Sequence, residues 1–358
     1  MNADAEKLIA NYLLLTPLVQ NGNNFNNQLN EGVLFAQPTA KKTFIAALET
    51  AAEVAEDMTW DNYLSDAVVE QAEALKVATT EFMNSMALCF PMGTAKVLAD
   101  QIGGLAQTEA YLNVMTYLAS DELDPLDVDL AVQALQGECI NAMTPEVLAR
   151  ATVDEPFDMT TFVVNPNIYQ DATDDEGNPT DIRINGWTLE TNADRAPRTG
   201  ATSGDTWMYT TSHSSNDAHN ISSATDYRQV VGTQPEVSAE GKYGLPTGAY
   251  RVEAATFLNH EWNKMRLYAQ TNSVEVSTVT GSAGKDSTVY AYTEIEYADS
   301  AFNGKQDVWD AAQATLGTTT VVPEIYVENG AVTIGIRGNG RVGGNDSWFL
   351  ADNFRLYY

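Results

Sequence analysis

The period of the hydrophobic pattern changes once along this chain, near residue 155. Before that point apolar side chains recur every three or four residues, as at Val68, Ala72 and Leu75, which is the period of an amphipathic helix. After it, apolar and polar residues alternate, as in residues 251–256. One segment cannot satisfy both periods, so the sequence predicts a helical bundle over residues 1–155 and an antiparallel β-sandwich over residues 156–358.

Capping and breaking signals divide the first part into several helices. The Asp-Pro pair at 124–125 and the Thr-Pro pair at 144–145 each place a capping side chain before a proline at the first helical position, and Thr39 is a further candidate N-cap. The Gly-Gly pair at 103–104 and the Asn-rich stretch 21–32 are interpreted as breaks. We expect three longer helices followed by three or four shorter ones.

Eight or nine period-two segments follow, separated by turn signals such as Glu-Asn-Gly at 328–330. Two antiparallel sheets packed as a jelly roll would satisfy this pattern. The glycine-rich stretch 338–344 resembles a dinucleotide-binding fingerprint, but that fingerprint needs a helix after its glycines, whereas residues 348–358 alternate like a strand. We therefore expect the glycines to connect the two strands of a closing hairpin, where positive φ is needed.

The formal net charge of −30 is spread over both parts of the chain. Phosphate backbones and anionic membrane surfaces are therefore disfavoured, and no nucleic-acid partner is expected. No apolar run is long enough to span a membrane. The first residues, MNADAEKLIANY, lack the basic start and apolar core of a signal peptide, so the chain is interpreted either as cytosolic or as a mature form without its leader.

Residue types that carry much enzyme chemistry are scarce here. Cys89 and Cys139 are interpreted as buried small hydrophobes, with a disulfide between them as the alternative in an exported protein. The 3 histidines show no zinc-ligand spacing, and neither a nucleophile elbow nor a P-loop occurs. We therefore expect a protein that is not an enzyme.

Several motifs of the second part occur in the order found in one known group of domains. They include INGWTLE (184–190), GLPTGAYRVEAATF (244–257) and WFLADNFRLYY (348–358). In these motifs the second part resembles the galactose-binding-like jelly rolls of carbohydrate-binding modules, closest to those on secreted and surface proteins of gut Bacteroidetes. The resemblance implies a jelly-roll fold, an extracellular or cell-surface location and a glycan partner. The helical part is similar, mostly in composition, to small three-helix modules found beside such domains.

Sugar binding needs aromatic faces for pyranose rings and planar side chains that hydrogen-bond to hydroxyl groups. Residues 259–266 collect both kinds in a loop expected between two strands. Trp187 and Trp348, which lie inside expected strands, are assigned to the core. The candidate ligand-binding residues are His260, Glu261, Trp262, Asn263 and Arg266, together with Trp207 and Asn345 in other expected loops.

Modules of the resembled fold often hold a structural calcium ion, which an aspartate of the last strand helps to bind. Asp352 occupies that position, and the acidic loop 170–181 offers Asp171, Asp174 and Asp175. Calcium takes about six to eight oxygen ligands, which clustered carboxylates can supply. The alternative is a solvated acidic loop. Structural calcium is the one cofactor that the sequence suggests, and otherwise none is expected.

These observations favour a non-catalytic secreted or surface protein of a bacterium, which captures a glycan through the loops of its jelly roll. The alternative is a structural or adhesive surface protein with no glycan ligand, in which the loops or the helical part contact another surface protein. An exposed aromatic ring in a loop cleft would favour the glycan, whereas an exposed apolar groove on the helices would favour the alternative.

Overall fold

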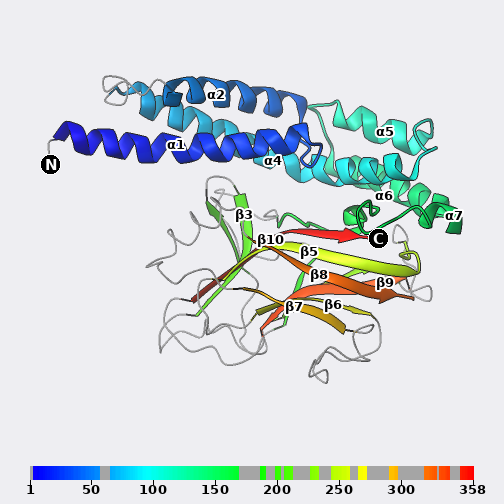
Figure 1. Ribbon diagram of the computed structural model, residues 1–358. Helices are drawn as coiled ribbons and strands as arrows, with labels where there is room; N and C mark the ends of the chain where they lie inside the picture. Colours follow the sequence, from blue (N-terminus) through cyan, green and yellow to red (C-terminus); the bar gives the residue numbers. More distant parts are fainter. Residues whose placement is uncertain are drawn as a thin grey trace. The chain divides into compact units, whose positions relative to one another are not determined.

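The computed structural model of this chain has helices in its N-terminal part and strands in its C-terminal part (Figure 1). This order confirms the predicted fold class, a helical region followed by an antiparallel β-sandwich. The structure describes residues 3–56, 65–168, 186–190, 198–202, 205–212, 226–233, 243–258, 265–271, 290–296, 318–328, 330–338 and 347–358.

The chain forms two compact units, each of which is described by itself. One comprises Met1–Gly93, Leu112–Leu130 and Thr202–Asp205, and the other comprises Thr94–Tyr111, Ala131–Ala201 and Thr206–Tyr358. The second unit therefore contains the end of the helical part as well as most of the strands. The domain boundary between residues 155 and 156 stays a prediction, because it separates types of secondary structure rather than compact units.

The α-helices of the described residues follow the expected pattern of three longer helices and then three shorter ones. None of them combines the length and the apolar character needed to cross a membrane. Their bounds are α1 Ala3–Asn30, α2 Pro38–Glu56, α4 Ala67–Ile102, α5 Glu109–Leu118, α6 Pro125–Ala142 and α7 Pro145–Leu148.

The break predicted at residues 21–32 is found only at the end of that stretch, because α1 continues to Asn30 and the chain turns at Gly32, with a φ of +73°. At Gly22 the helix lies so close to α2 that an added Cβ would stand 2.6 Å from Leu48 Cδ1. Three residues later Phe25 packs against Phe44 and Phe82, whose rings stack with centroids 4.6 Å apart. Tertiary packing thus outweighs the poor helix propensity of the asparagines in this stretch.

The other helix signals are borne out at three places. The Gly-Gly pair at 103–104 ends α4, with φ of +77° and +80°. Asp124 Oδ1 accepts a hydrogen bond from the N–H of Leu126 at 2.9 Å, and Thr144 Oγ1 accepts one from the N–H of Val147 at 3.4 Å. Both side chains therefore cap the first turn of the helix that follows them.

Thr39 is not an N-cap, because it lies inside the first turn of α2. Its N–H and its hydroxyl both donate hydrogen bonds to the carboxylate of Asp121, at 2.8 Å and 2.6 Å. An acceptor from far along the chain thus satisfies the orphan donors at this helix start.

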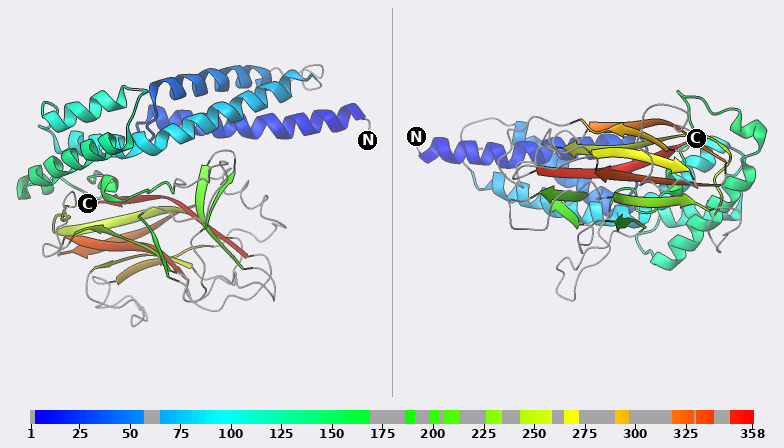
Figure 2. Two further views of the ribbon diagram at one scale, coloured as in Figure 1. Left: turned by 180° about the vertical axis from the view of Figure 1, so that it is seen from behind. Right: turned by 90° about the horizontal axis from the view of Figure 1, so that it is seen from below.

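The β-strands of the described residues form two sheets, which can be followed in Figure 2. Their bounds are β1 Thr188–Glu190, β2 Arg198–Thr202, β3 Asp205–Ser212, β4 Asp226–Gly232, β5 Gly248–Leu258, β6 Met265–Thr271, β7 Tyr290–Glu294, β8 Thr318–Val327, β9 Ala331–Gly338 and β10 Ser347–Tyr357. The first sheet has the order β1-β4-β9-β6-β7, and the second has the order β2-β3-β10-β5-β8. The described part thus holds more strands than the eight or nine expected.

Alternate side chains of the two sheets build the core of the sandwich. In β9 the side chains of Val332, Ile334 and Ile336 are fully buried, as the period of two requires. Trp187 is buried against Phe354, with ring centroids 4.4 Å apart, so its assignment to the core is confirmed. The side chain of Trp348 lies outside the described residues, although its backbone belongs to β10.

The predicted closing hairpin is wrong, because β9 and β10 belong to different sheets. β9 pairs with β4 on one side and with β6 on the other, and β10 pairs with β3 and β5. Both edges of each strand are thus occupied, so the chain between them crosses from one sheet to the other. Residues 339–346, which include three of the glycines, lie outside the described residues.

Within the second unit, the last turn of α4 is fastened to the start of the sandwich. Gln101 Nε2 donates a hydrogen bond to the carbonyl of Pro156 at 3.1 Å, and Gln101 Oε1 accepts one from the N–H of Asp158 at 2.8 Å. Phe157 and Tyr358 exchange two backbone hydrogen bonds, of 3.1 Å and 2.9 Å. The end of the helical part and the last strand are therefore held together in one compact unit.

The two cysteines match the first of their two interpretations. Cys89 and Cys139 are free thiols and both are buried. Burial raises the pKa of each thiol to about 12. Both are thus protonated, unreactive members of the core.

Candidate functional site

Two of the candidate ligand-binding residues lie in strands, not in loops as predicted. Arg266 belongs to β6 and Trp207 belongs to β3. Met265 and Leu267, the two neighbours of Arg266, are both fully buried. Arg266 therefore already belongs to the alternating pattern of a strand, with its side chain on the opposite face. The side chain of Trp207 and the whole of His260, Glu261, Trp262, Asn263 and Asn345 lie outside the described residues, so their roles stay predictions.

Arg266 points to the face of the first sheet that lies away from the core. Leu267 in β6 and its partner Ile336 in β9 are fully buried, so Arg266 and its own partner Arg337 take the opposite direction. The strand register aligns Asp226, Arg337, Arg266 and Glu294 across four neighbouring strands. We call these four residues the charged row.

Tyrosines and a third arginine lie beside the charged row on the same face. The register pairs Arg228 with Gly335, Gly335 with Tyr268, and Tyr268 with Tyr292, two residues along each strand. Tyr290 lies a further two residues along β7, opposite Gln270. The arginine–tyrosine face, as we name this surface, consists of Asp226, Arg228, Arg266, Tyr268, Tyr290, Tyr292, Glu294 and Arg337.

Arg266 is held in place by three neighbours from β7, one of which, Tyr290, accepts a side-chain hydrogen bond from it. Its Nε lies 2.7 Å from Glu294 Oε1, in a hydrogen-bonded ion pair. Its guanidinium carbon lies 4.0 Å from the centroid of the Tyr292 ring, which is a cation–π contact. Only 15% of the Arg266 side chain is exposed, against 48% of Glu294. The remaining N–H groups of Arg266 are thus oriented before any ligand arrives.

Tyr268 forms the floor of the face because its cross-strand partner is a glycine. A Cβ on Gly335 would stand 2.9 Å from Cε1 of the Tyr268 ring, so the ring lies where a side chain would otherwise be. The Tyr268 hydroxyl donates a hydrogen bond to Asp226 Oδ1 at 2.8 Å, and Arg228 lies 3.7 Å from Asp226 Oδ2. Burial, and next the Asp226 carboxylate, raise the pKa of Tyr268 well above its ordinary value.

Tyr290 extends this floor towards the edge of the sheet. Its ring centroid lies 5.5 Å from that of Tyr268 and 5.7 Å from that of Tyr292. Burial raises the pKa of Tyr290, while the nearby guanidinium groups of Arg266 and Arg337 oppose the rise. The face therefore has a buried tyrosine floor and a partly exposed rim of arginine and glutamate.

Arg337 differs from the other two arginines of the face. Arg228 lies near Asp226 and Arg266 is paired with Glu294. In the part of the chain that the structure describes, the Arg337 guanidinium has neither a hydrogen bond nor an ion pair, and the residue is partly exposed. Among the described residues of the face, Arg337 is thus the arginine that neither a hydrogen bond nor an ion pair engages.

Asp352, the metal candidate of the last strand, is 1% exposed. The next residue, Asn353, has a φ of +53°, and the register with β5 shifts at this point. The N–H of Phe354 donates a hydrogen bond to the carbonyl of Pro166 at 2.8 Å. This bond joins the strand to the turn that contains Pro166, which is rich in carbonyl and amide oxygens. A buried carboxylate beside such oxygens has the donor chemistry that calcium prefers.

The three acidic loop candidates for the metal, Asp171, Asp174 and Asp175, lie outside the described residues. Among the residues that are described, no group of three or more His, Cys, Asp or Glu side chains is placed to hold a metal ion. Binding of calcium therefore stays a prediction.

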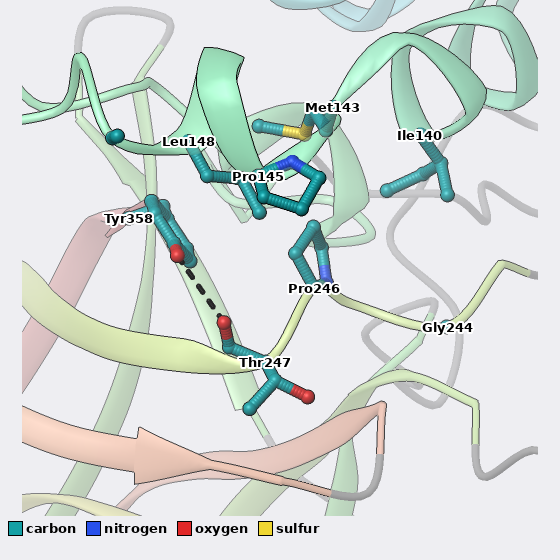
Figure 3. A pocket seen from close by; sticks show the side chains of 9 residues that line it. Ile140, Met143, Pro145, Leu148, Gly244, Pro246, Thr247 and Tyr358 are labelled. Atoms are coloured by element: carbon teal, nitrogen blue, oxygen red, sulfur yellow. Dashed lines mark hydrogen bonds between the residues drawn. The ribbon is translucent and has the colours of Figure 1, made fainter.

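The second unit also contains an apolar pocket of about 620 Å³ (Figure 3). It is lined by Ile140, Met143, Pro145, Leu148, Ala149, Gly244, Pro246, Thr247 and Tyr358. The Tyr358 hydroxyl donates a hydrogen bond to the carbonyl of Thr247 at 3.2 Å. This bond holds the Tyr358 ring in the wall of the pocket. No charged side chain lines this pocket, so it lacks the converging polar groups that would orient a polar ligand.

Comparison with known proteins adds little to this geometry. No protein-family model and no curated protein sequence matches the chain. Among solved structures, TmCBM61 in complex with beta-1,4-galactotriose is similar at 16% sequence identity, with 48% of this chain and 88% of that chain covered and a TM-score of 0.26. A TM-score of this size supports no inference, so the assignment of a β-sandwich rests on the strand pairing described above.

Sequence reasoning missed most residues of the arginine–tyrosine face. A signal was present, because Tyr290, Tyr292 and Glu294 alternate with apolar residues in one stretch, and Arg337 ends another. Each stretch taken alone indicates a strand with one wetter face. The register between strands, which joins them into one site, cannot be obtained from alternation within each strand.

Proposed function

We propose that the β-sandwich binds carbohydrate without catalysis, and that the arginine–tyrosine face forms the binding surface. The observation that supports this proposal is the Arg266–Tyr292–Glu294 arrangement, in which oriented donors and acceptors adjoin aromatic rings on an outer sheet face. Sugars are bound by apolar contact of their C–H groups with aromatic rings and by planar side chains that bond to hydroxyl groups.

The oriented state of these groups favours sugar binding. A guanidinium fixed by Glu294 and by the Tyr292 ring loses little side-chain freedom when a ligand binds, so more of the interaction energy appears as affinity. Asp226 is already bound by Tyr268 and stays with the floor. Arg337, with Arg266 beside it, is left to bond to the ligand.

The loop candidates of the sequence extend this proposal. His260, Glu261, Trp262 and Asn263 precede Arg266 in the chain, and β6 begins at Met265. We include Trp262 in the proposal as an aromatic contact for the ligand. We also propose an extracellular or cell-surface location in a bacterium, because glycans are available to the protein there.

The test is a glycan array probed with the full chain and with Arg266→Gln. The matched control is Arg251→Gln, which removes the same charge from β5 in the other sheet. We expect wild type and Arg251→Gln to share their binding glycans and Arg266→Gln to lose at least about tenfold in affinity for them. Absence of binding across plant, host and microbial glycans would disprove the proposal.

Contact with another protein through the helices is a second candidate function. The observation that favours it is a set of exposed apolar side chains within the first unit, including Leu126 at 65% and Leu130 at 56%, which lie one helical turn apart on α6. Silence on the glycan array together with self-association that Leu126→Glu abolishes would favour this second function.

A further inference from the structure

We propose that the arginine–tyrosine face selects an acidic sugar, and that the carboxylate of a uronic acid binds between Arg337 and Arg266. This inference rests on the proposed function, because it names the class of glycan that the same face would take.

The strand register places two arginines directly opposite each other. Arg266 and Arg337 are direct cross-strand partners in an antiparallel pair, so their Cβ atoms stand about 4.5–5.5 Å apart on the same side of the sheet. Two like charges at directly opposed positions destabilise a sheet. An anion between the two guanidinium groups would remove this repulsion, so the pair favours a negatively charged ligand over a neutral one.

The other charged side chains of the face already have partners. Glu294 compensates Arg266 at 2.7 Å, and Asp226 is engaged by the Tyr268 hydroxyl at 2.8 Å and approached by Arg228 at 3.7 Å. Within the described residues nothing compensates Arg337 by a hydrogen bond or an ion pair. Among the described residues of the row, Arg337 is therefore the one charged side chain that no hydrogen bond or ion pair engages, although the row as a whole, with two arginines and two carboxylates, is neutral.

Geometry selects a carboxylate among anions. The planar fork of an arginine matches the two oxygens of a carboxylate, and such charge-assisted pairs are about twice as strong as neutral hydrogen bonds. The strongly acidic chain repels long polyanions, whereas a short uronate oligosaccharide carries few charges and one of its carboxylates is bound at short range. The partly exposed Tyr292 ring, which Arg266 contacts, would then face the C–H groups of the same sugar.

The experiment uses the full chain and matched probes. Calorimetry measures its affinity for oligogalacturonate, oligoglucuronate and oligomannuronate, and for each of these after its carboxylates are reduced to hydroxymethyl groups. We expect at least one uronate to bind, and its reduced form to bind about tenfold more weakly or worse. Higher salt should weaken binding of the uronate more than binding of its reduced form.

Variants locate the effect. Arg337→Gln should weaken uronate binding about tenfold or more while leaving the affinity for the reduced form nearly unchanged. Lys42→Gln, which removes an equal charge from an exposed position of α2, should bind the uronate like wild type. If Arg337→Gln does not fold, the comparison of the two probe forms on wild type still decides the question.

Each other outcome overturns the inference. Equal binding of a uronate and its reduced form, or unchanged uronate binding in folded Arg337→Gln, would leave a glycan-binding protein without this selectivity. Binding of neutral or sulfated glycans with no uronate bound would do the same. Binding of poly-glutamate in place of every glycan would overturn the proposed function as well.

Discussion

At the scale of single residues, Gly335 is the residue on which the tyrosine floor depends. A side chain there would collide with the backbone carbonyl of Tyr227 and with the ring of Tyr268. The ring of Tyr268 can therefore lie across β9 and reach Asp226 only because Gly335 has no Cβ. Glycine ordinarily weakens a strand, but at this position it permits the buried hydrogen bond between Tyr268 and Asp226.

We expect Gly335→Ala to lower the free energy of unfolding by about 1–3 kcal/mol, because the rigid carbonyl cannot move aside and the Tyr268 ring must shift. Gly244→Ala is the matched control, since its nearest atom would stand 3.3 Å away and its φ is not positive. Urea unfolding of both variants measures the difference. Equal stability of the two would show that Tyr268 does not need the space above Gly335.

The raised pKa of Tyr268 makes the free energy of unfolding depend on pH. Its pKa is raised in the folded protein, first by burial and then by Asp226, so the folded state holds this proton more tightly than the unfolded chain, where the pKa is about 10. The resulting stabilisation is fully present below that pH and is lost as the pH rises above it.

Tyr268→Phe should therefore lose less stability than wild type between about pH 9 and pH 11, even if it is less stable at pH 7. Urea unfolding at a series of pH values gives the two slopes. Tyr326→Phe, at a tyrosine that is 40% exposed, should keep the wild-type slope. A wild-type slope in Tyr268→Phe would contradict the account of the floor.

At the scale of elements, local signals predicted starts and ends of helices well. Asp124 caps α6 as the sequence indicates, because the carboxylate and the backbone N–H donors that it accepts from lie within three residues. The same kind of reasoning failed at Thr39 and over most of residues 21–32, where Asp121 and the Phe44–Phe82 pair act from distant parts of the chain. Short-range signals are thus reliable only where the partners are also short-range.

The cap of α6 gives a prediction at this scale. Asp124→Ala should lower the free energy of unfolding by about 0.5–2 kcal/mol, because the N–H groups of Leu126 and Asp127 lose their acceptor. Asp124→Asn should cost far less, since asparagine caps about as well as aspartate. Thermal unfolding of the three proteins tests this, and equal losses in both variants would assign the effect to charge instead of capping.

At the scale of the whole molecule, the period of the sequence predicted the fold class but not how the strands assemble. The alternation in β9 and β10 indicated two strands correctly, yet their assignment to one hairpin was wrong because some pairing partners lie more than a hundred residues away. For the same reason Arg266 was predicted as a binding residue, whereas its partners Arg337 and Glu294 were not. Register is set by the packed sandwich as a whole.

Calcium provides a prediction for the sandwich as a unit. A ligand that binds only the folded state raises its stability, so we expect saturating calcium to raise Tm by several degrees relative to EDTA. Asp352→Asn should abolish this rise, while Asp154→Asn, at an exposed position, should keep it. Calorimetric scans that give one Tm for wild type in calcium and in EDTA would remove calcium from the account.

The most direct test of the central claim is to locate a bound glycan by hydrogen–deuterium exchange of the full chain, with and without the strongest ligand of the array. A glycan bound on the arginine–tyrosine face should slow exchange in β6, β7 and β9, the strands that carry Arg266, Tyr292 and Arg337. Protection that instead maps to residues 140–149 and 244–247 around the apolar pocket, or to the helices alone, would contradict a binding site on the arginine–tyrosine face.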